Sequence, residues 1–138
     1  MTPDAARSRF ALARVARLAT VGVNRAPHIV PVTFAIDGDR IVTAVDAKPK
    51  RGAPLRRLAN IRADPRVSLL ADEYDDDWEK LWWVRADGEA RIVAEDPGLG
   101  RALALLRARY AQYATVALIG PAVVIDVGRW VGWSAAER

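Results

Sequence analysis

The stretch PHIVPVTFAIDGDRIVTAV, residues 27–45, contains two runs with the alternation of β-strands. Bulky side chains occur at every second position from His28 to Ile36, which places them on one face of a strand. The turn at residues 37–39 tolerates the positive φ angles of a tight hairpin, because Asp-Gly is a strong hairpin signal. Residues 40–45 then form the return strand. The stretch predicts an antiparallel hairpin and, with it, a mainly β fold.

Further strands and three helices are expected around this hairpin. Thr2, Pro3 and Asp4 form an N-cap signal for a helix that continues to about Leu18. Apolar spacing places on its core face Ala11, Leu12, Val15 and Leu18. The other helices are expected at 54–63 and 97–113, and the other strands at 18–23, 66–71, 80–95 and 122–133.

Residues 80–95 form either one long strand or a hairpin that turns at Asp87-Gly88. The strand runs outnumber the helices by about six to three and follow one another along the chain, which favours an antiparallel barrel with helices packed outside. A doubly wound fold would need helices and strands that alternate strictly.

Composition indicates a single domain, residues 1–138. The apolar content of 51% is enough for one core. The chain has no cysteine, which excludes disulfides, thiolate metal sites and thiol nucleophiles. No segment has the unbroken apolar run of a signal peptide or the about 20 apolar residues of a membrane span. We therefore expect a cytoplasmic protein without a membrane partner.

Positive charge is concentrated in one segment. The net charge of the chain is +4, but residues 48–66 carry +6 and the remainder is net acidic at −2. A nucleic-acid surface spreads Lys and Arg over many phosphates, whereas one clustered segment at a helix start suits a small polyanion better. The segment predicts a phosphate site or, as the alternative, a solvated basic loop. The candidate phosphate ligands are Lys48, Lys50, Arg56 and Arg57.

The sequence offers few groups that could react on their own. His28 is the single histidine, which excludes multi-histidine metal sites. Neither a nucleophile elbow nor a GxGxxG or Walker A motif occurs, and the acidic run 72–79 lacks the spacing of a calcium loop. An enzyme built from this chain would therefore depend on the chemistry of a cofactor.

Five tryptophans are present in the chain. Trp82 and Trp83 are adjacent in a predicted strand, so they face opposite sides and at most one of them points into the core. Trp130 and Trp133 lie near the end of the last strand, where they could line a dimer seam or a pocket rim. Packing in the core is the alternative for each of them.

Four blocks of sequence together resemble one known superfamily: GVNRAPHIVPVTFAIDGDRIVTAVDAKPK, LRRLANIRADPRVSLLAD, DDDWEKLWWVRADGEARIV and RWVGWSA. They resemble the pyridoxamine 5′-phosphate oxidase-like split β-barrel superfamily, over about residues 8–135. KPK, LWWVR and RWVGW resemble its actinobacterial branch of coenzyme F420-dependent oxidoreductases. The resemblance implies an FMN-binding-like split β-barrel of antiparallel Greek-key type, and a homodimer with cofactor sites at the subunit interface.

The resemblance also implies an activity, hydride transfer between coenzyme F420 and a small organic substrate. The alternatives are an FMN-dependent oxidoreductase on the same scaffold and a non-catalytic flavin, deazaflavin or heme carrier. No catalytic side chain, metal or nucleic-acid partner is implied. The implied cofactor-binding residues are His28, Val30, Pro31, Val32, Thr33, Thr43, Ala44, Val45, Lys48, Lys50, Arg56, Arg57, Trp83 and Trp130.

Overall fold

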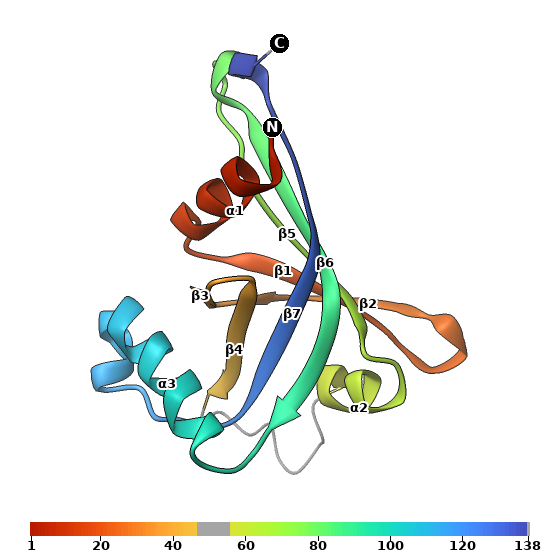
Figure 1. Ribbon diagram of the computed structural model, residues 1–138, viewed down its shortest axis with the longest axis vertical. Helices are drawn as coiled ribbons and strands as arrows, with labels where there is room; N and C mark the ends of the chain where they lie inside the picture. The colour runs from red at the N-terminus through yellow and green to blue at the C-terminus, as the bar shows by residue number, and fades with distance from the viewer. Residues whose placement is uncertain (47–55, 138) are drawn as a thin grey trace.

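The computed structural model describes residues 1–46 and 56–137, which form one antiparallel sheet with flanking helices (Figure 1). Within this part of the chain the strands are β1 (Ala16–Val21), β2 (Pro27–Val32), β3 (Ala35–Asp37), β4 (Arg40–Asp46), β5 (Arg66–Glu73), β6 (Trp82–Val93) and β7 (Leu118–Ser134). The α-helices are α1 (Pro3–Leu12), α2 (Arg56–Ala63) and α3 (Gly98–Arg109). The short 3-10 helices are η1 (Val23–Arg25), η2 (Trp78–Lys80), η3 (Ala111–Ala114) and η4 (Ala135–Glu137).

The order of the strands explains how the barrel closes. Neighbouring strands are antiparallel and follow the order β2-β1-β5-β6-β7-β4-β3. The two edge strands, β2 and β3, are thus consecutive in the chain, and Thr33 and Phe34 alone separate them. Such a connection spans at most about 11 Å, so the sheet must curl until its two edges meet. The covalent chain closes the barrel, and the antiparallel barrel predicted from the sequence is confirmed.

The predicted first strand is interrupted at this closure. The run expected as one strand over residues 27–36 ends at Val32 and resumes at Ala35. The backbone N–H of Phe34 donates a hydrogen bond to the Tyr110 hydroxyl at 3.1 Å, and the Phe34 carbonyl accepts one from it at 3.0 Å. Because a side chain supplies these partners, Phe34 needs no partner in the ladder.

The Asp-Gly-Asp turn forms the predicted hairpin, with β3 and β4 as its arms. Asp37 pairs with Arg40 across the turn. Gly38 has a φ of 62°, which glycine adopts without strain. No atom lies within 4 Å of the position that a Cβ on Gly38 would take. The turn therefore needs the conformational freedom of this residue, and not its small size.

Strands β6 and β7 are long and lie side by side in the middle of the sheet (Figure 1). They pair along the whole of β6, so residues 80–95 contain one long strand and no hairpin. Asp87-Gly88 marks a register shift in the β6–β7 ladder instead. A Cβ on Gly88 would lie 2.2 Å from the carbonyl oxygen of Asp126. A close approach of two backbones thus requires glycine here.

Aromatic rings from α1, the β2–β3 connection and β7 meet inside the barrel. The ring of Phe10 lies 4.8 Å from that of Phe34 and 5.5 Å from that of Trp130. Burying one such side chain stabilises the fold by about 1.5 to 3 kcal/mol. The other large side chains fully buried in this cluster are Leu18, Ile41, Leu69, Val84, Val123 and Ile125.

Helix α1 is shorter than the sequence indicates. The hydroxyl of Thr2 accepts a hydrogen bond from the N–H three residues later, which confirms the predicted N-cap. The helix ends at Leu12 instead of near Leu18, because the following residues pair with β2 and β5. Its buried side chains are Ala6 and Phe10, whereas Leu12 is 73% exposed. The prediction that Leu12 lies on the core face of this helix is therefore wrong.

Helix α3 covers the outer face of β4 and β7. Its predicted start is confirmed, since Oδ1 of Asp96 accepts a hydrogen bond from the Gly100 N–H at 2.8 Å. The predicted apolar face is buried in a second cluster that includes Ala102, Leu103 and Leu106 from the helix and Val42 and Val124 from the strands. Tyr110, directly after the helix, belongs to the same cluster.

Candidate functional site

A pocket of about 340 Å³ lies between the end of β2, the middle of β4 and the start of α2, and we call it the β2–β4 pocket. Its volume falls at the low end of the range for small-molecule sites. Strands β2 and β4 are not neighbours in the sheet, so the pocket spans the seam where the barrel closes. It is lined by Val15, Pro31, Val32, Thr33, Thr43, Ala44, Arg57 and Tyr113.

Most of this lining was predicted from the sequence. Three residues come from the end of β2 and its connection, two from β4 and one from α2. The structure thus brings together residues that lie up to 26 positions apart in the chain. The predicted residues that line the pocket are Pro31, Val32, Thr33, Thr43, Ala44 and Arg57.

The polar groups of the lining are hydroxyls and a guanidinium. Thr33, Thr43 and Tyr113 supply the hydroxyls, and Arg57 in the first turn of α2 supplies the positive charge. Arg keeps its charge at any ordinary pH and matches the oxygens of a phosphate in a bidentate way. The pocket therefore offers both kinds of partner that a phosphorylated ring compound needs.

Tyr113, like Val15, is a lining residue of this site that sequence reasoning missed. Its hydroxyl oxygen lies 2.6 Å from Oγ1 of Thr33, and either oxygen can be the donor. The sequence predicted that Tyr113 belongs to a helix over residues 97–113, whereas α3 ends at Arg109 and Tyr113 lies in η3. No local signal marks its role, because its partner is 80 positions away in the chain.

Tyr110 anchors the same side of the pocket to the barrel. Besides its bonds to Phe34, its hydroxyl faces the carbonyl oxygen of Arg14 at 2.9 Å. The guanidinium of Arg14 lies 4.6 Å from the centre of the Tyr110 ring, and that of Arg109 lies 4.5 Å from the centre of the Phe34 ring. Burial lowers the pKa of Arg109, but a guanidinium stays protonated. These contacts fix the connection that carries Thr33.

His28 and Arg56 line a different pocket, which we call the η1–α2 pocket. Its volume is about 400 Å³. Nδ1 of His28 is buried and has no hydrogen-bond partner among the residues that the structure describes. Residues 27–31 of β2 span roughly 13 Å between the two pockets, so one elongated ligand could contact both. The rest of the lining is Gly22, Val23, Ala26, Pro27, Ala59 and Asn60.

Two of the other predicted residues, Val30 and Val45, line neither pocket. Val30 and Val45 are partly buried and pack against the core of the barrel. Lys48 and Lys50 lie outside the described residues, together with the start of the helix predicted at 54. Their part in a phosphate site stays a prediction.

The two predicted tryptophans also lie away from both pockets. Trp130 is buried in the barrel, and its indole N–H donates to Oδ1 of Asp39 at 3.2 Å. Trp83 pairs with Trp133 near the start of β6. Near the other end of β6, Ile92 pairs with the same β7 residue that pairs with Thr43 of β4. Trp83 therefore lies about nine residues along β6, roughly 30 Å, from the level of Thr43. Trp83 therefore cannot form a wall of the β2–β4 pocket of its own chain.

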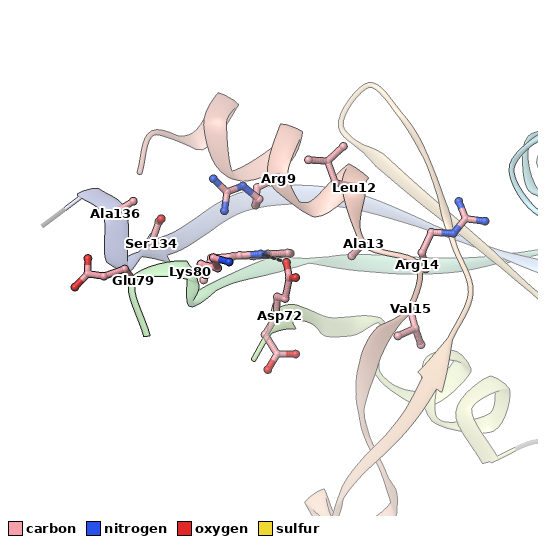
Figure 2. Close-up of a pocket in the computed structure, with 12 residues that line it drawn as sticks. Arg9, Leu12, Ala13, Arg14, Val15, Asp72, Glu79, Lys80, Ser134 and Ala136 are labelled. Carbon is pink, nitrogen blue, oxygen red and sulfur yellow. Dashed lines mark hydrogen bonds between the residues drawn. The ribbon is translucent and has the colours of Figure 1, made fainter. Parts of the chain in front are cut away.

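A larger groove of about 750 Å³ lies between α1 and the ends of β5 and β6 (Figure 2). Trp82 forms part of it, with the guanidinium of Arg9 at 5.4 Å from the centre of its ring. Its indole N–H donates to Oε2 of Glu73 at 2.9 Å. None of the predicted site residues lines this groove. Since six predicted residues line the β2–β4 pocket and none lines this groove, the β2–β4 pocket is the better candidate site.

Two kinds of feature do not occur in residues 1–46 and 56–137. No group of three or more His, Cys, Asp or Glu side chains is placed to hold a metal ion. No helix in these ranges combines the length and the apolar character that crossing a membrane requires.

A family model matches nearly the whole sequence. This model is described as pyridoxamine 5′-phosphate oxidase, and it matches residues 2–129. The chain belongs to this family. Among curated proteins, no relative matches the sequence.

Several solved structures share the fold of this member of the pyridoxamine 5′-phosphate oxidase family. A conserved hypothetical protein from Mycobacterium tuberculosis has a TM-score of 0.76 and 24% identity, over 98% of this chain and 86% of that one. A FAD-binding protein from Mesorhizobium loti has 0.71 and 20%, over 96% and 92%. A heme-binding protein from Mycobacterium smegmatis has 0.71 and 22%, over 96% and 57%. These likenesses confirm the predicted split β-barrel.

Proposed function

We propose that this protein is an oxidoreductase that binds coenzyme F420 in the β2–β4 pocket and transfers a hydride between this deazaflavin and a small unsaturated or quinone-like substrate. The observation that supports the proposal is the pocket itself. Six predicted residues line it, and its lining supplies hydroxyls and a guanidinium. Membership of the pyridoxamine 5′-phosphate oxidase family supports a redox role. The similarity of KPK, LWWVR and RWVGW to the F420-dependent branch supports the choice of cofactor.

Each part of the site has a task in this proposal. Arg57 holds the phosphate through charge-assisted hydrogen bonds. Strand β2 pairs with β1 on one side and has no strand partner on its other side within the described residues, so its backbone can bind the polar edge of the ring. When bound, the reduced cofactor supplies a hydride to the substrate, which takes a proton from solvent, and the cofactor is left oxidised. No side chain has to act as a nucleophile.

A homodimer is part of the same proposal. Trp83 lies roughly 30 Å along β6 from the pocket of its own chain. It can therefore line the substrate pocket only of a second copy of the chain. Large apolar side chains also stay exposed, and a second copy of the chain would cover some of them. They include Val23 at 81%, Ile29 at 63% and Trp133 at 37% exposure.

The second candidate is an FMN-dependent oxidoreductase on the same scaffold. The observation that favours it is the shared fold of the FAD-binding protein from Mesorhizobium loti. FMN and coenzyme F420 both combine a planar ring with a phosphate, so the β2–β4 pocket suits either of them. A heme carrier, as the Mycobacterium smegmatis protein is described, becomes an outcome of the test.

Titration of the purified protein with coenzyme F420, FMN and heme, followed by absorption and fluorescence, tests the proposal. We expect coenzyme F420 to bind most tightly. Arg57→Ala should weaken its binding by about tenfold or more, since hydrogen bonds to charged groups contribute about 1.5 to 3 kcal/mol. The matched control is Arg62→Ala, on the same helix but exposed and outside both pockets, and it should bind like the parent.

Two results would contradict parts of this proposal. Tight binding of FMN or heme without binding of coenzyme F420 would show that the cofactor is wrong. Equal affinity of Arg57→Ala and the parent for coenzyme F420 would show that Arg57 does not hold the phosphate.

A further inference from the structure

Two hydroxyl groups meet in the wall of the β2–β4 pocket. Oγ1 of Thr33 and the phenol oxygen of Tyr113 lie 2.6 Å apart, at the short end for an O–H···O hydrogen bond, which is about 2.7 Å on average. Both residues line the pocket, and both are partly buried. The two hydroxyls thus form a hydrogen-bonded pair in the lining of the pocket.

Tyr110 holds both members of this pair in place. Its ring meets that of Tyr113 edge to face, with the centroids 5.8 Å apart. Its hydroxyl binds both backbone groups of Phe34, the residue directly after Thr33. The buried Tyr110 thus supports the geometry of the pair from both sides. Preorganised groups of this kind bind a ligand without a cost of ordering.

Counting donors and acceptors shows what the pair can offer. Two hydroxyls together have two O–H donors and four acceptor positions. The bond between them uses one donor and one acceptor, so one O–H and several lone pairs remain. Because either oxygen can be the donor, the remaining groups can meet an acceptor or a donor. The pyrimidine edge of a flavin or deazaflavin ring alternates C=O and N–H groups in this way.

We propose that the hydroxyl pair of Thr33 and Tyr113 binds the polar edge of the cofactor's ring, and that Tyr113 is a cofactor-binding residue of the site. The inference rests on the proposed function, since it needs a ring compound in the β2–β4 pocket. It adds a side-chain partner from η3 to the backbone of β2. Arg57 takes the phosphate of the same molecule, so the two groups act on different parts of it.

Three variants test whether the hydroxyls bind the ring or only maintain the shape of the pocket. Tyr113→Phe and Thr33→Val each remove one hydroxyl with little change in volume, and Thr33→Ser keeps it. We expect coenzyme F420 and FMN, titrated separately, to bind about tenfold more weakly to the first two variants, as one hydrogen bond contributes about 1 kcal/mol or somewhat more. Thr33→Ser should bind like the parent. The double variant should lose less affinity than the two single losses together predict, because each single change already breaks the pair.

The absorption spectrum of the bound ring is a second readout, because a hydrogen bond to a ring carbonyl shifts the visible band. We expect the band of the bound ring in Tyr113→Phe to be shifted from its position in the parent. The matched control is Tyr74→Phe, since Tyr74 is 71% exposed and lines neither pocket. It should leave the affinity and the spectrum unchanged.

The outcomes distinguish this inference from the proposed function. Parent-like affinity and spectrum in Tyr113→Phe would overturn the inference and leave the proposed function standing, even if that variant melts at a lower temperature. A parent protein that binds neither coenzyme F420 nor FMN would overturn both.

Discussion

Replacing Tyr110 with Phe would test how the barrel closes. The change removes one oxygen atom and keeps the ring, so the main loss is the acceptor for the backbone N–H of Phe34. Phe34 is completely buried, and this N–H cannot turn to water instead. An unsatisfied buried donor costs about 1 to 3 kcal/mol. We therefore expect Tyr110→Phe to lower the free energy of unfolding by about 2 kcal/mol.

Urea unfolding followed by tryptophan fluorescence measures this change. The midpoint should fall without a change in slope, because the surface exposed on unfolding stays the same. In a thermal scan Tm should fall by about 8 °C, at about 4 °C per kcal/mol for a domain of this size. The matched control is Tyr74→Phe, whose hydroxyl has a contact of 3.5 Å with the indole N–H of Trp78. It should change the stability by less than about 0.5 kcal/mol.

The same variant connects stability with the site. Since Tyr110 fixes the connection that carries Thr33, Tyr110→Phe should also weaken the binding of coenzyme F420. A Tyr110→Phe protein within about 0.5 kcal/mol of the parent would refute the reasoning. It would mean that the Phe34 N–H finds another acceptor and that closure of the barrel does not depend on this hydroxyl.

Two further predictions concern the backbone and the response to pH. Gly88→Ala should lower the free energy of unfolding by about 2 kcal/mol or more, because its Cβ would clash with Asp126 and force the strands apart; Gly38→Asn, in open space at a φ of 62°, should be nearly neutral in the same urea assay. The hydrogen bond from the Arg66 side chain lowers the pKa of Asp64 to about 2. Because the ordinary pKa is about 3.9, the pair stabilises the fold above about pH 4 and loses this effect as the pH falls toward 2. A carbon-13 NMR titration of the Asp64 carboxyl checks this, and a midpoint near 4 would contradict it.

Local rules predicted the elements whose ends are set by local chemistry. The turn at Gly38 needs a positive φ, and the start of α3 needs a side-chain acceptor such as Asp96, so short motifs were sufficient at both places. The end of α1 at Leu12 was missed, because strand pairing with distant residues ends that helix. The break at Phe34 was missed for the same reason, since Tyr110 lies 76 positions away.

The candidate site also contains residues that local patterns could predict and residues whose place depends on distant contacts. The strand residues around Thr33 and Thr43 could be predicted, because a family resemblance carries over along the aligned strands. Tyr113 could not, since its place in the pocket depends on how η3 folds back across the barrel. Arg56 and Arg57 were predicted as one cluster, but adjacent positions on a helix point in different directions. They therefore line two different pockets.

The pairing of β4 with β7 determines how early the barrel can form while the chain is being synthesised. Arg40 pairs with Asp126, which is 86 residues later in the chain. A ribosome adds about 5 to 20 residues per second, so β4 waits roughly 4 to 17 s for its partner strand. Thr43 and Ala44 pair with the same late strand. A cofactor therefore cannot serve as an early template for the nascent chain, because its pocket is assembled only after β7 has been made.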